Sequence, residues 1–361
     1  MIHELAAVAA EVRPALAPGS AKPIAVVGAG AIVDVGHLPA YRAAGLDVAG
    51  LTDLDPDRAR TVAARHGVPR VYADVDELLA DDAVEVVDVA VPGPAQPPLV
   101  ERALRSGRHV LAQKPLAPDP ATGRRLVSLA SSLGLVLTVN QQLRYDEGIA
   151  AAHAMVARGW VGRVHSVTFE VRIHTDWSPW PWLLDSPRLE VSYHSIHYHD
   201  VVRWFLGEPD AVFCAAGRAP GQRAVAETST VTAYLFAEGV RALVIADHNT
   251  TRAAPSATFQ VDGSDGVIRG TLGLLYDYPH GRPDTLELHS DVLGTDGWVP
   301  YPVTRRWIPD AFAGPMLALL AHAAGGPEPV TSARDNVGTL ELVEALYRSQ
   351  QTGEAQHLRP T

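Results

Sequence analysis

The sequence predicts an α/β protein of two domains, in which a doubly wound parallel sheet is followed by an α+β domain with a largely antiparallel open sheet. Two observations support this fold class. Between residues 22 and 143, short apolar strands alternate with helical segments, which is typical of a parallel sheet covered on both faces. After residue 150, longer segments alternate strictly between apolar and polar residues, as strands buried on one face do.

The first half contains five strands of the buried type. We expect them at Ile24–Gly28, Asp47–Asp53, Val84–Val91, His109–Gln113 and Leu135–Asn140. Helix signals separate the second strand from the third. Asp55 is placed as an N-cap before Pro56, and Gly67 is placed as the stop of that helix. Asp74 and Glu77 have the spacing of a capping box, which predicts the start of the next helix.

The second half begins with the segment VHSVTFEVRIHT (164–175). It places Val167, Phe169, Val171 and Ile173 on one face, and further strand-like segments follow at 228–236, 239–247, 257–263 and 266–273. The last 50 residues return to a helical pattern. We therefore expect an N-terminal arm or short helix over residues 1–20, a first domain over 21–143 and a second domain over 144–361.

Composition limits the possible partners and compartment. The net charge is −11 without any block of basic residues, so we expect no nucleic-acid partner. No run of 18 apolar residues occurs, and Glu4 stands where a secretory signal would be positive, so we expect neither a membrane span nor a signal peptide. The single cysteine, Cys214, excludes an intramolecular disulfide. These features predict a cytoplasmic protein.

The segment GAGAIV (28–33) follows the first strand and opens a helical run. Gly28 and Gly30 let the backbone approach a pyrophosphate at the helix N-terminus, with Ile32 and Val33 beside it. Val33 replaces the third glycine of the fingerprint, so this helix should lie slightly further from the strand. Asp53, which stands 25 residues after Gly28, can bind an adenosine ribose and repel a 2′-phosphate. The pattern predicts a Rossmann dinucleotide-binding domain with NAD, and NADP is less favoured.

Four segments resemble the Gfo/Idh/MocA oxidoreductases. They are VVGAGAIVDVGHLPAY, GRHVLAQKPLA, HSIHYHDVVRWFLGEP and TLELVEALYRS, and the resemblance covers nearly the whole chain. It implies an N-terminal Rossmann domain and a C-terminal substrate domain. The family's Glu-Lys-Pro motif, whose lysine lies beside the nicotinamide and the reacting hydroxyl, matches Gln113-Lys114-Pro115 here. The resemblance thus implies that Lys114 is catalytic and that Lys114 and Gln113 contact the cofactor, where we also place Pro92 and Gln96.

The family's second motif is an aspartate, three residues, a histidine, two residues and a final aspartate or asparagine. Matching the final position to Asp200 places His197 at the family histidine and Tyr193 where the catalytic aspartate usually stands. His197 is the natural base, because an imidazole titrates near neutral pH. Tyr193 is a weaker base unless a cation such as Lys114 stabilises its phenolate.

The three histidines of YHSIHYHD raise the question of a metal site. On a regular α-helix Tyr193, His197 and Asp200 share one stripe, His194 lies about 60° from it and His199 points nearly the opposite way. At most His194 and His197 could share a metal, and the sequence shows no further ligands. We expect a proton-transfer face and no metal, and the alternatives are a zinc site or buried core histidines.

Aromatic and basic residues near this segment are candidates for substrate binding. The loop DWSPWPWLLD (176–185) carries Trp177 and Trp180, whose indole faces suit the C–H faces of sugars. The alternative is a lid packed into the core or a subunit contact. Arg144 contacts either the substrate or a surface carboxylate. With His194 and Asp200, these residues form the predicted substrate site.

Together these patterns predict an NAD-linked dehydrogenase that acts on a secondary hydroxyl of a sugar, an inositol-like polyol or a sugar derivative. A second hypothesis is elimination or glycoside cleavage through transient oxidation. A third is a dinucleotide-binding regulator without turnover, since Tyr193 and Gln113 replace two family residues. We expect a homodimer or homotetramer, because the outer face of the antiparallel sheet needs cover.

Overall fold

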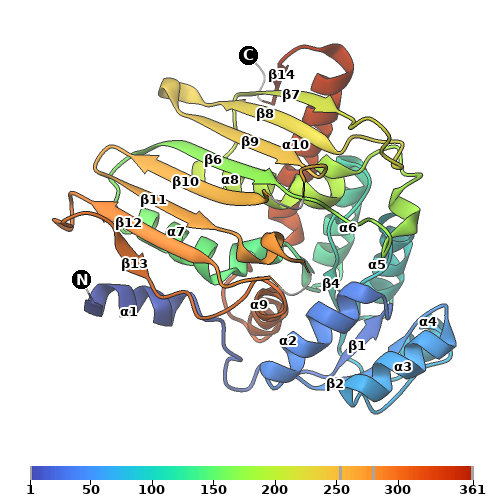
Figure 1. Cartoon of the computed structure of the whole chain (residues 1–361). Coiled ribbons are helices and arrows are strands. Elements are labelled where there is room, and N and C mark those ends of the chain that lie inside the picture. Colours follow the sequence, from blue (N-terminus) through green and yellow to red (C-terminus); the bar gives the residue numbers. More distant parts are fainter. Residues whose placement is uncertain (1, 252–253, 279–280, 359–361) are drawn as a thin grey trace. The chain divides into compact units, whose positions relative to one another are not determined.

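The computed structural model describes residues 2–251, 254–278 and 281–358. They form two compact units, each with its own sheet (Figure 1). The parallel-sheet unit comprises residues 14–145 and 307–340, and the antiparallel-sheet unit comprises residues 1–13, 146–306 and 341–361. Within the described ranges, no helix has the length and apolar character needed to cross a membrane.

The parallel-sheet unit has the five strands that the sequence predicts. They are β1 (Ile24–Val27), β2 (Val48–Thr52), β3 (Val86–Val89), β4 (His109–Ala112) and β5 (Leu137–Val139). Their order is β2-β1-β3-β4-β5, and each pair is parallel. The order reverses beside β1, so the topological switch point lies at the carboxyl ends of β1 and β3, where such sheets bind their ligands.

The same unit contains helices, most of which connect these strands. They are η1 (Val33–His37, a π-helix), α2 (Leu38–Ala43), α3 (Pro56–His66), α4 (Val75–Ala80), η2 (Gly93–Ala95), α5 (Gln96–Arg105), α6 (Pro120–Ser132), η3 (Gln142–Tyr145), η8 (Asp310–Phe312) and α9 (Ala313–Ala323). The predicted caps are confirmed: Asp55 accepts from Asp57 N and Arg58 N, and Gly67 is left-handed with φ 72°. Asp74 likewise accepts from Glu77 N.

Two apolar layers cover the parallel sheet. The α5 and α6 side includes Ala25, Leu104 and Leu126, all buried. On the opposite side, Tyr41 of α2 and Met316 of α9 belong to one buried apolar cluster. Helix α9 therefore completes the first unit although it lies close to the end of the chain, which the sequence pattern did not indicate. Helix α10 (Ala333–Thr352) follows it and runs from this unit into the other.

The antiparallel-sheet unit has nine strands in the order β13-β12-β11-β10-β6-β9-β8-β7-β14. They are β6 (Val164–Arg172), β7 (Ala211–Gly217), β8 (Ser229–Leu235), β9 (Arg241–Asp247), β10 (Ser256–Gly263), β11 (Gly266–Thr271), β12 (Thr285–Ser290), β13 (Val299–Tyr301) and β14 (Gln356–His357). Only β6 and β9 pair in parallel. The predicted largely antiparallel sheet is confirmed.

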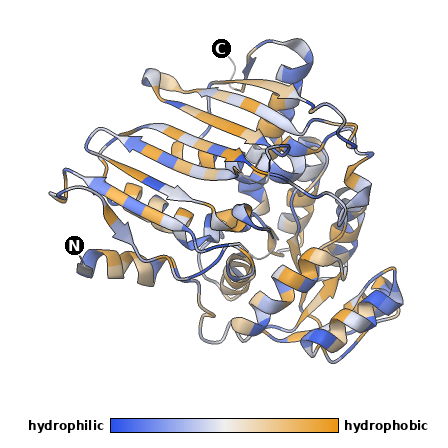
Figure 2. Cartoon of the chain, viewed as in Figure 1, coloured by the Kyte–Doolittle hydropathy of each residue, from blue (hydrophilic) through white to orange (hydrophobic). Residues whose placement is uncertain are grey.

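Helices α7 (Glu147–Ala157) and α8 (Ile196–Leu206) pack against one face of this sheet (Figure 1). The unit's other helical segments are α1 (Ile2–Glu11), η4 (Pro181–Leu183), η5 (Glu190–Ser195, a π-helix), η6 (Ala237–Gly239) and η7 (Gly273–Tyr276). The predicted alternation is confirmed in β6, where Val167, Phe169 and Val171 are fully buried. Figure 2 shows the same alternation of apolar and polar residues along the neighbouring strands. Of the expected arm or short helix over residues 1–20, residues 2–11 form helix α1.

Candidate active site

The glycine turn after β1 fits a bound dinucleotide. Gly28 has φ 109°, and a Cβ there would lie 2.3 Å from the carbonyl oxygen of Ala90, so only glycine fits. Apart from the neighbouring backbone of its own segment, no atom of the described residues lies within 4 Å of the position that a Cβ on Gly30 would take, which leaves room for a ligand beside the backbone. The side chain of Val33 is fully buried against Val26 and Leu51, so it supports the turn from inside.

Asp53 lies next to this turn. Its Oδ2 accepts a hydrogen bond of 2.7 Å from Ala29 N, and its Oδ1 accepts one of 2.7 Å from Arg58 Nη2. Desolvation by itself raises the pKa of Asp53, but the hydrogen bonds from Arg58, Asp55 N and Ala29 N outweigh it and lower the pKa. Asp53 is therefore a fixed anion beside the glycine turn, at the place expected for ribose recognition.

The turn Gln113-Lys114-Pro115 leaves the carboxyl end of β4 in the same unit. Buried Gln96 holds its backbone, because Nε2 donates to the carbonyl oxygens of Gln113 at 2.5 Å and Pro115 at 2.8 Å. Desolvation lowers the pKa of Lys114 to about 8. The structure thus gives Gln96 a supporting role for the turn, and its predicted contact with the cofactor stays a prediction. Pro92 begins the loop after β3 at the same edge.

Gln113 belongs to a buried polar network that the sequence did not reveal. Its Oε1 accepts from Lys114 N at 2.8 Å, and its Nε2 lies 3.0 Å from His37 Nε2. The other ring nitrogen of His37 lies 2.6 Å from Asp88 Oδ2, which also accepts from Tyr41 OH. The network joins the end of β4 to η1 and β3, and so fixes the backbone that precedes Lys114.

Arg144 lies in η3, and its guanidinium contacts two residues of its own unit. Its Nη1 donates to the carbonyl oxygen of Val330 at 2.6 Å, and its Nη2 lies 2.8 Å from Asp335 Oδ2. The side chain is buried. The ion pair that the sequence offered as an alternative is present, with Arg144 buried and Asp335 partly exposed. The predicted contact of Arg144 with substrate stays a prediction.

The YHSIHYHD segment begins as a π-helix and continues as α8. The regular spacing assumed for the whole segment therefore holds only from Ile196 onward. His197 and Asp200 are both buried in α8. Burial raises the pKa of Tyr193, and the nearby Arg188 partly opposes this rise. Within its own unit Tyr193 is therefore a neutral phenol. The phenolate paired with Lys114 stays a prediction, because Lys114 belongs to the other unit.

His199 faces away from this group, as predicted. Its Nε2 lies 2.9 Å from Ser195 Oγ, and its Nδ1 contacts the hydroxyl of Tyr234. The ring is fully buried, and desolvation lowers the pKa of His199 to about 4. It is a neutral core histidine.

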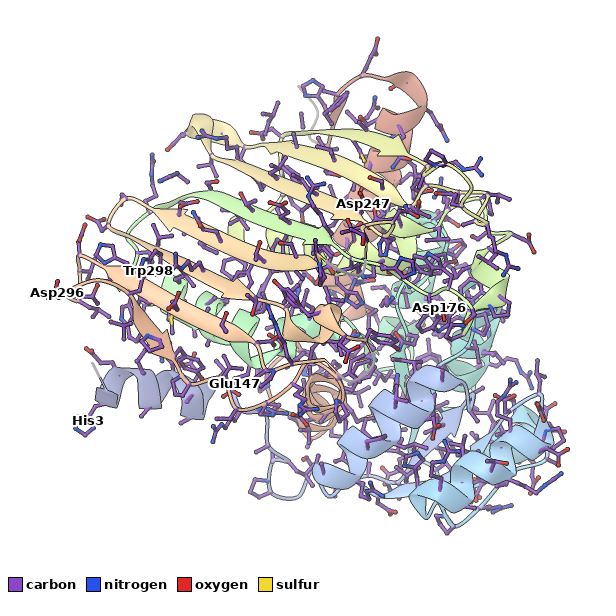
Figure 3. The ribbon with its side chains drawn as sticks, viewed as in Figure 1. His3, Glu147, Asp176, Asp247, Asp296 and Trp298 are labelled. Carbon is purple, nitrogen blue, oxygen red and sulfur yellow. The ribbon has the colours of Figure 1, made fainter. Side chains whose placement is uncertain are left out.

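His194 meets Glu190 and His248 instead of sharing a ligand with His197. One side-chain N or O atom from each of these three residues lies within 4.8 Å of the others. Figure 3 labels Asp247, which ends β9 directly before His248. Desolvation by itself raises the pKa of Glu190, but His248 and Thr230 outweigh it and lower the pKa. This group was missed, because its two outer members lie 58 residues apart in the sequence.

The tryptophan loop, which begins at the Asp176 labelled in Figure 3, packs against the same unit. The ring of Trp177 lies 5.0 Å from that of His248, and Trp182 meets Tyr193 edge-on at 5.0 Å. Trp180 lies 6.0 Å from Tyr278. All three indoles are partly buried. The loop is thus packed as a cover over the histidine cluster, and the stacking of Trp177 and Trp180 on a sugar stays a prediction.

Comparison with known proteins gives consistent matches to both halves of the chain. Residues 22–141 match a family model described as "Oxidoreductase family, NAD-binding Rossmann fold", and residues 149–269 match the GFO/IDH/MocA C-terminal domain. A D-apiose dehydrogenase of Paraburkholderia graminis is 30% identical over 335 residues, which cover 90% of this chain and 86% of the relative. A myo-inositol dehydrogenase of Streptomyces leeuwenhoekii is 29% identical, with 90% and 97% covered.

Solved structures share the fold. An oxidoreductase from Agrobacterium radiobacter in complex with NAD+, L-tartaric acid and magnesium has a TM-score of 0.82 at 23% identity, and the match covers 93% of this chain and 98% of that one. The predicted family is confirmed by these matches. The chain therefore belongs to the GFO/IDH/MocA family of NAD(P)-dependent oxidoreductases.

Proposed function

We propose that the chain oxidises a secondary hydroxyl group of a sugar, an inositol-like polyol or a sugar derivative, with NAD as the hydride acceptor. The turn Gln113-Lys114-Pro115 carries the proposal. It holds a lysine of lowered pKa at the same carboxyl edge of the sheet as Gly28 and Asp53. The names of the relatives support the substrate class, since they include dehydrogenases of D-apiose and myo-inositol.

Asp53 supports NAD over NADP, because a fixed anion beside the glycine turn repels a 2′-phosphate. The relatives include both kinds of enzyme. A D-xylose 1-dehydrogenase of Haloferax volcanii, 25% identical over 327 residues, is named for NADP. The choice therefore rests on this chain's own residue.

In this proposal, one residue accepts the proton of the substrate hydroxyl and two others donate hydrogen bonds. His197 accepts the hydroxyl proton, since a base must take it as hydride leaves the same carbon. Lys114 donates a hydrogen bond to the reacting oxygen. Tyr193 stands at the family's aspartate position, and as a neutral phenol it donates a hydrogen bond and is not a base. NAD, when bound, supplies the hydride-accepting ring.

Transient oxidation followed by elimination or glycoside cleavage is the second candidate. It uses the same cofactor site and the same first step, so the products and the net reduction of NAD distinguish it. A regulator without turnover gains no support from the relatives, whose names include several dehydrogenases.

The test is a screen of sugars, inositols, sugar acids and glycosides with NAD, in which nicotinamide absorbance and products are both measured. We expect one reduced cofactor for each oxidised product. Products formed with catalytic amounts of NAD and no net reduction would support cleavage. Tight NAD binding without turnover on every compound would contradict both. Lys114→Met should abolish turnover, and Lys22→Met is the matched control at the only other lysine in the chain.

A further inference from the structure

Glu190, His194 and His248 form a compact cluster in the antiparallel-sheet unit. Glu190 and His194 come from the π-helix η5, and His248 directly follows β9. A π-helix inside a longer helix is rare, and it often marks a functional site. Glu190 and His248 have no role in the reaction proposed above.

The carboxylate of Glu190 is oriented toward the two imidazoles. Its Oε2 accepts hydrogen bonds from Ser195 Oγ at 3.0 Å and Thr230 Oγ1 at 2.7 Å. Its Oε1 lies 3.9 Å from His194 Nδ1 and 3.7 Å from His248 Nε2, which is too long for hydrogen bonds.

Glu190 is fully buried, and among the described residues none donates a hydrogen bond to Oε1. A buried carboxylate oxygen without a donor is costly, so the arrangement points to a cation at this position.

The imidazole of His248 is held in the orientation of a metal ligand. Its Nδ1 lies 2.6 Å from Thr175 Oγ1, while Nε2 is turned toward Glu190 and has no hydrogen-bond partner within residues 2–251, 254–278 and 281–358. Ligating histidines are typically fixed in this way through the second ring nitrogen. The ring of Trp177, at 5.0 Å, covers this buried imidazole.

His194 supplies the second imidazole. Its ring meets that of His248 edge-to-face at 4.2 Å, and its side chain is 18% exposed. The cluster is thus enclosed on the side of Glu190 and His248, and solvent can reach it beside His194. An ion can enter along this route.

We propose that Glu190, His194 and His248 bind a divalent transition-metal ion of the zinc class. Two imidazoles and one carboxylate are the donor set of open zinc sites, whereas magnesium and calcium prefer oxygen ligands only. In a tetrahedral site with bonds of about 2.1 Å, ligand atoms lie about 3.4 Å apart. Small side-chain rotations would shorten the distances from Glu190 Oε1 to His194 Nδ1 and His248 Nε2, 3.9 Å and 3.7 Å, to this value. Three protein ligands leave a fourth position for water or for a hydroxyl oxygen of a bound sugar.

The test measures zinc binding by the full chain without cofactor or substrate. Chelator-stripped protein receives Zn²⁺ alone, the dissociation constant is measured by competition with a chromogenic chelator, and stoichiometry is measured by mass spectrometry after gel filtration. We expect one zinc per chain. Glu190→Gln and His248→Ala should each weaken binding by at least about 100-fold, the upper end of the effect seen for mere supporting residues. His289→Ala, which removes a half-exposed imidazole from β12, should leave the dissociation constant unchanged.

A second measurement does not depend on how the variants fold. X-ray absorption at the zinc edge of the unaltered protein should show two imidazoles and only oxygen besides. A spectrum without imidazole, an absence of stoichiometric binding, or zinc binding by both variants as tight as by the unaltered protein would overturn the proposal. In those cases the cluster is a histidine–glutamate ion pair or a water site. Because no turnover is measured, failure here leaves the proposed dehydrogenase reaction standing.

Discussion

At the scale of single residues, Gln113 shows why this chain departs from the family's Glu-Lys-Pro motif. When His37 Nδ1 donates to Asp88, His37 Nε2 becomes an acceptor, and the amide of Gln113 can donate to it. A glutamate at position 113 would place an acceptor against an acceptor. The substitution is therefore compatible with an ordered Lys114, and it does not by itself argue for a protein without turnover.

Asp53 gives the first prediction at this scale. Asp53→Ser should narrow the preference for NAD over NADP by about tenfold, which corresponds to about 1.4 kcal/mol. The substitution removes the anion and releases Arg58, whose guanidinium can then pair with a 2′-phosphate. Calorimetric titration with both cofactors measures the ratio. Adding Arg58→Ala to Asp53→Ser should reverse part of the gain, whereas tighter NADP binding by the unaltered protein would refute the assignment.

Lys114 gives the second prediction at this scale. Its NMR signal can be assigned readily, because the chain contains only two lysines, Lys22 and Lys114. Desolvation lowers the pKa of Lys114 to about 8, so this ammonium should lose its proton as the pH passes through 8. Isotope-labelled lysine observed by NMR should give one signal that titrates there, and Lys114→Arg should remove that signal. If protonated Lys114 assists the reaction, kcat/KM should fall above pH 8 from this group. A midpoint near 10 would contradict the lowered pKa.

At the scale of elements, strong local signals were predictable and weak ones were not. The caps at Asp55 and Asp74 and the alternation in β6 follow from local chemistry, and they were confirmed. The short strands β13 and β14 have three and two residues, too few for a visible alternation. The π-helix η5 could not be foreseen, because no local propensity separates it from an α-helix. It altered the expected neighbours of His194.

Helix α7 gives a prediction about pH and stability. Its N-cap, Asp146, lies against Asp284, and both are buried. Desolvation and the adjacent Asp284 raise the pKa of Asp146 well above its usual range, so Asp146 retains a proton and shares it with Asp284. A raised carboxyl pKa means that the folded state holds a proton that the unfolded chain releases. The free energy of unfolding should thus fall with rising pH, by about 1.4 kcal/mol per unit between the two pKa values.

The variant Asp146→Asn imitates the protonated form and retains the N-cap. It should flatten this slope and raise the free energy of unfolding at pH 8. Asp296→Asn, at an exposed position of the same unit, is the control. Denaturant unfolding measured from pH 4 to 8 gives both slopes. Equal slopes in Asp146→Asn and the unaltered protein would show that the pair does not share a proton.

At the scale of the whole molecule, the sequence predicted both sheets, the family and the cofactor turn, but not every contact between distant segments. Helix α9 packs in the parallel-sheet unit, and His248 lies beside Glu190. Both are contacts between segments far apart in the sequence, which no local pattern predicts. The motif residues could be predicted because each motif spans only a few positions of the sequence. The cluster of Glu190, His194 and His248 could not be predicted, because folding alone brings its members together.

The expected homo-oligomer is a prediction at this scale. The outer face of the antiparallel sheet exposes Phe213, Val231 and Leu235 on β7 and β8. Apolar side chains grouped on a sheet face favour association. Sedimentation at micromolar concentration should show a dimer or tetramer, and Leu235→Glu should shift it toward the monomer. A monomer in the unaltered protein would contradict this expectation.

The most direct test of the central claim separates cofactor binding from proton transfer. The glycine turn and Asp53 belong to the parallel-sheet unit, and His197 belongs to the antiparallel-sheet unit. His197→Ala should therefore lower turnover by about two to four orders of magnitude, the usual scale for a general base, and leave the dissociation constant of NAD unchanged. Full turnover in His197→Ala, measured by nicotinamide absorbance with the substrate found in the screen, would contradict the assignment of the base.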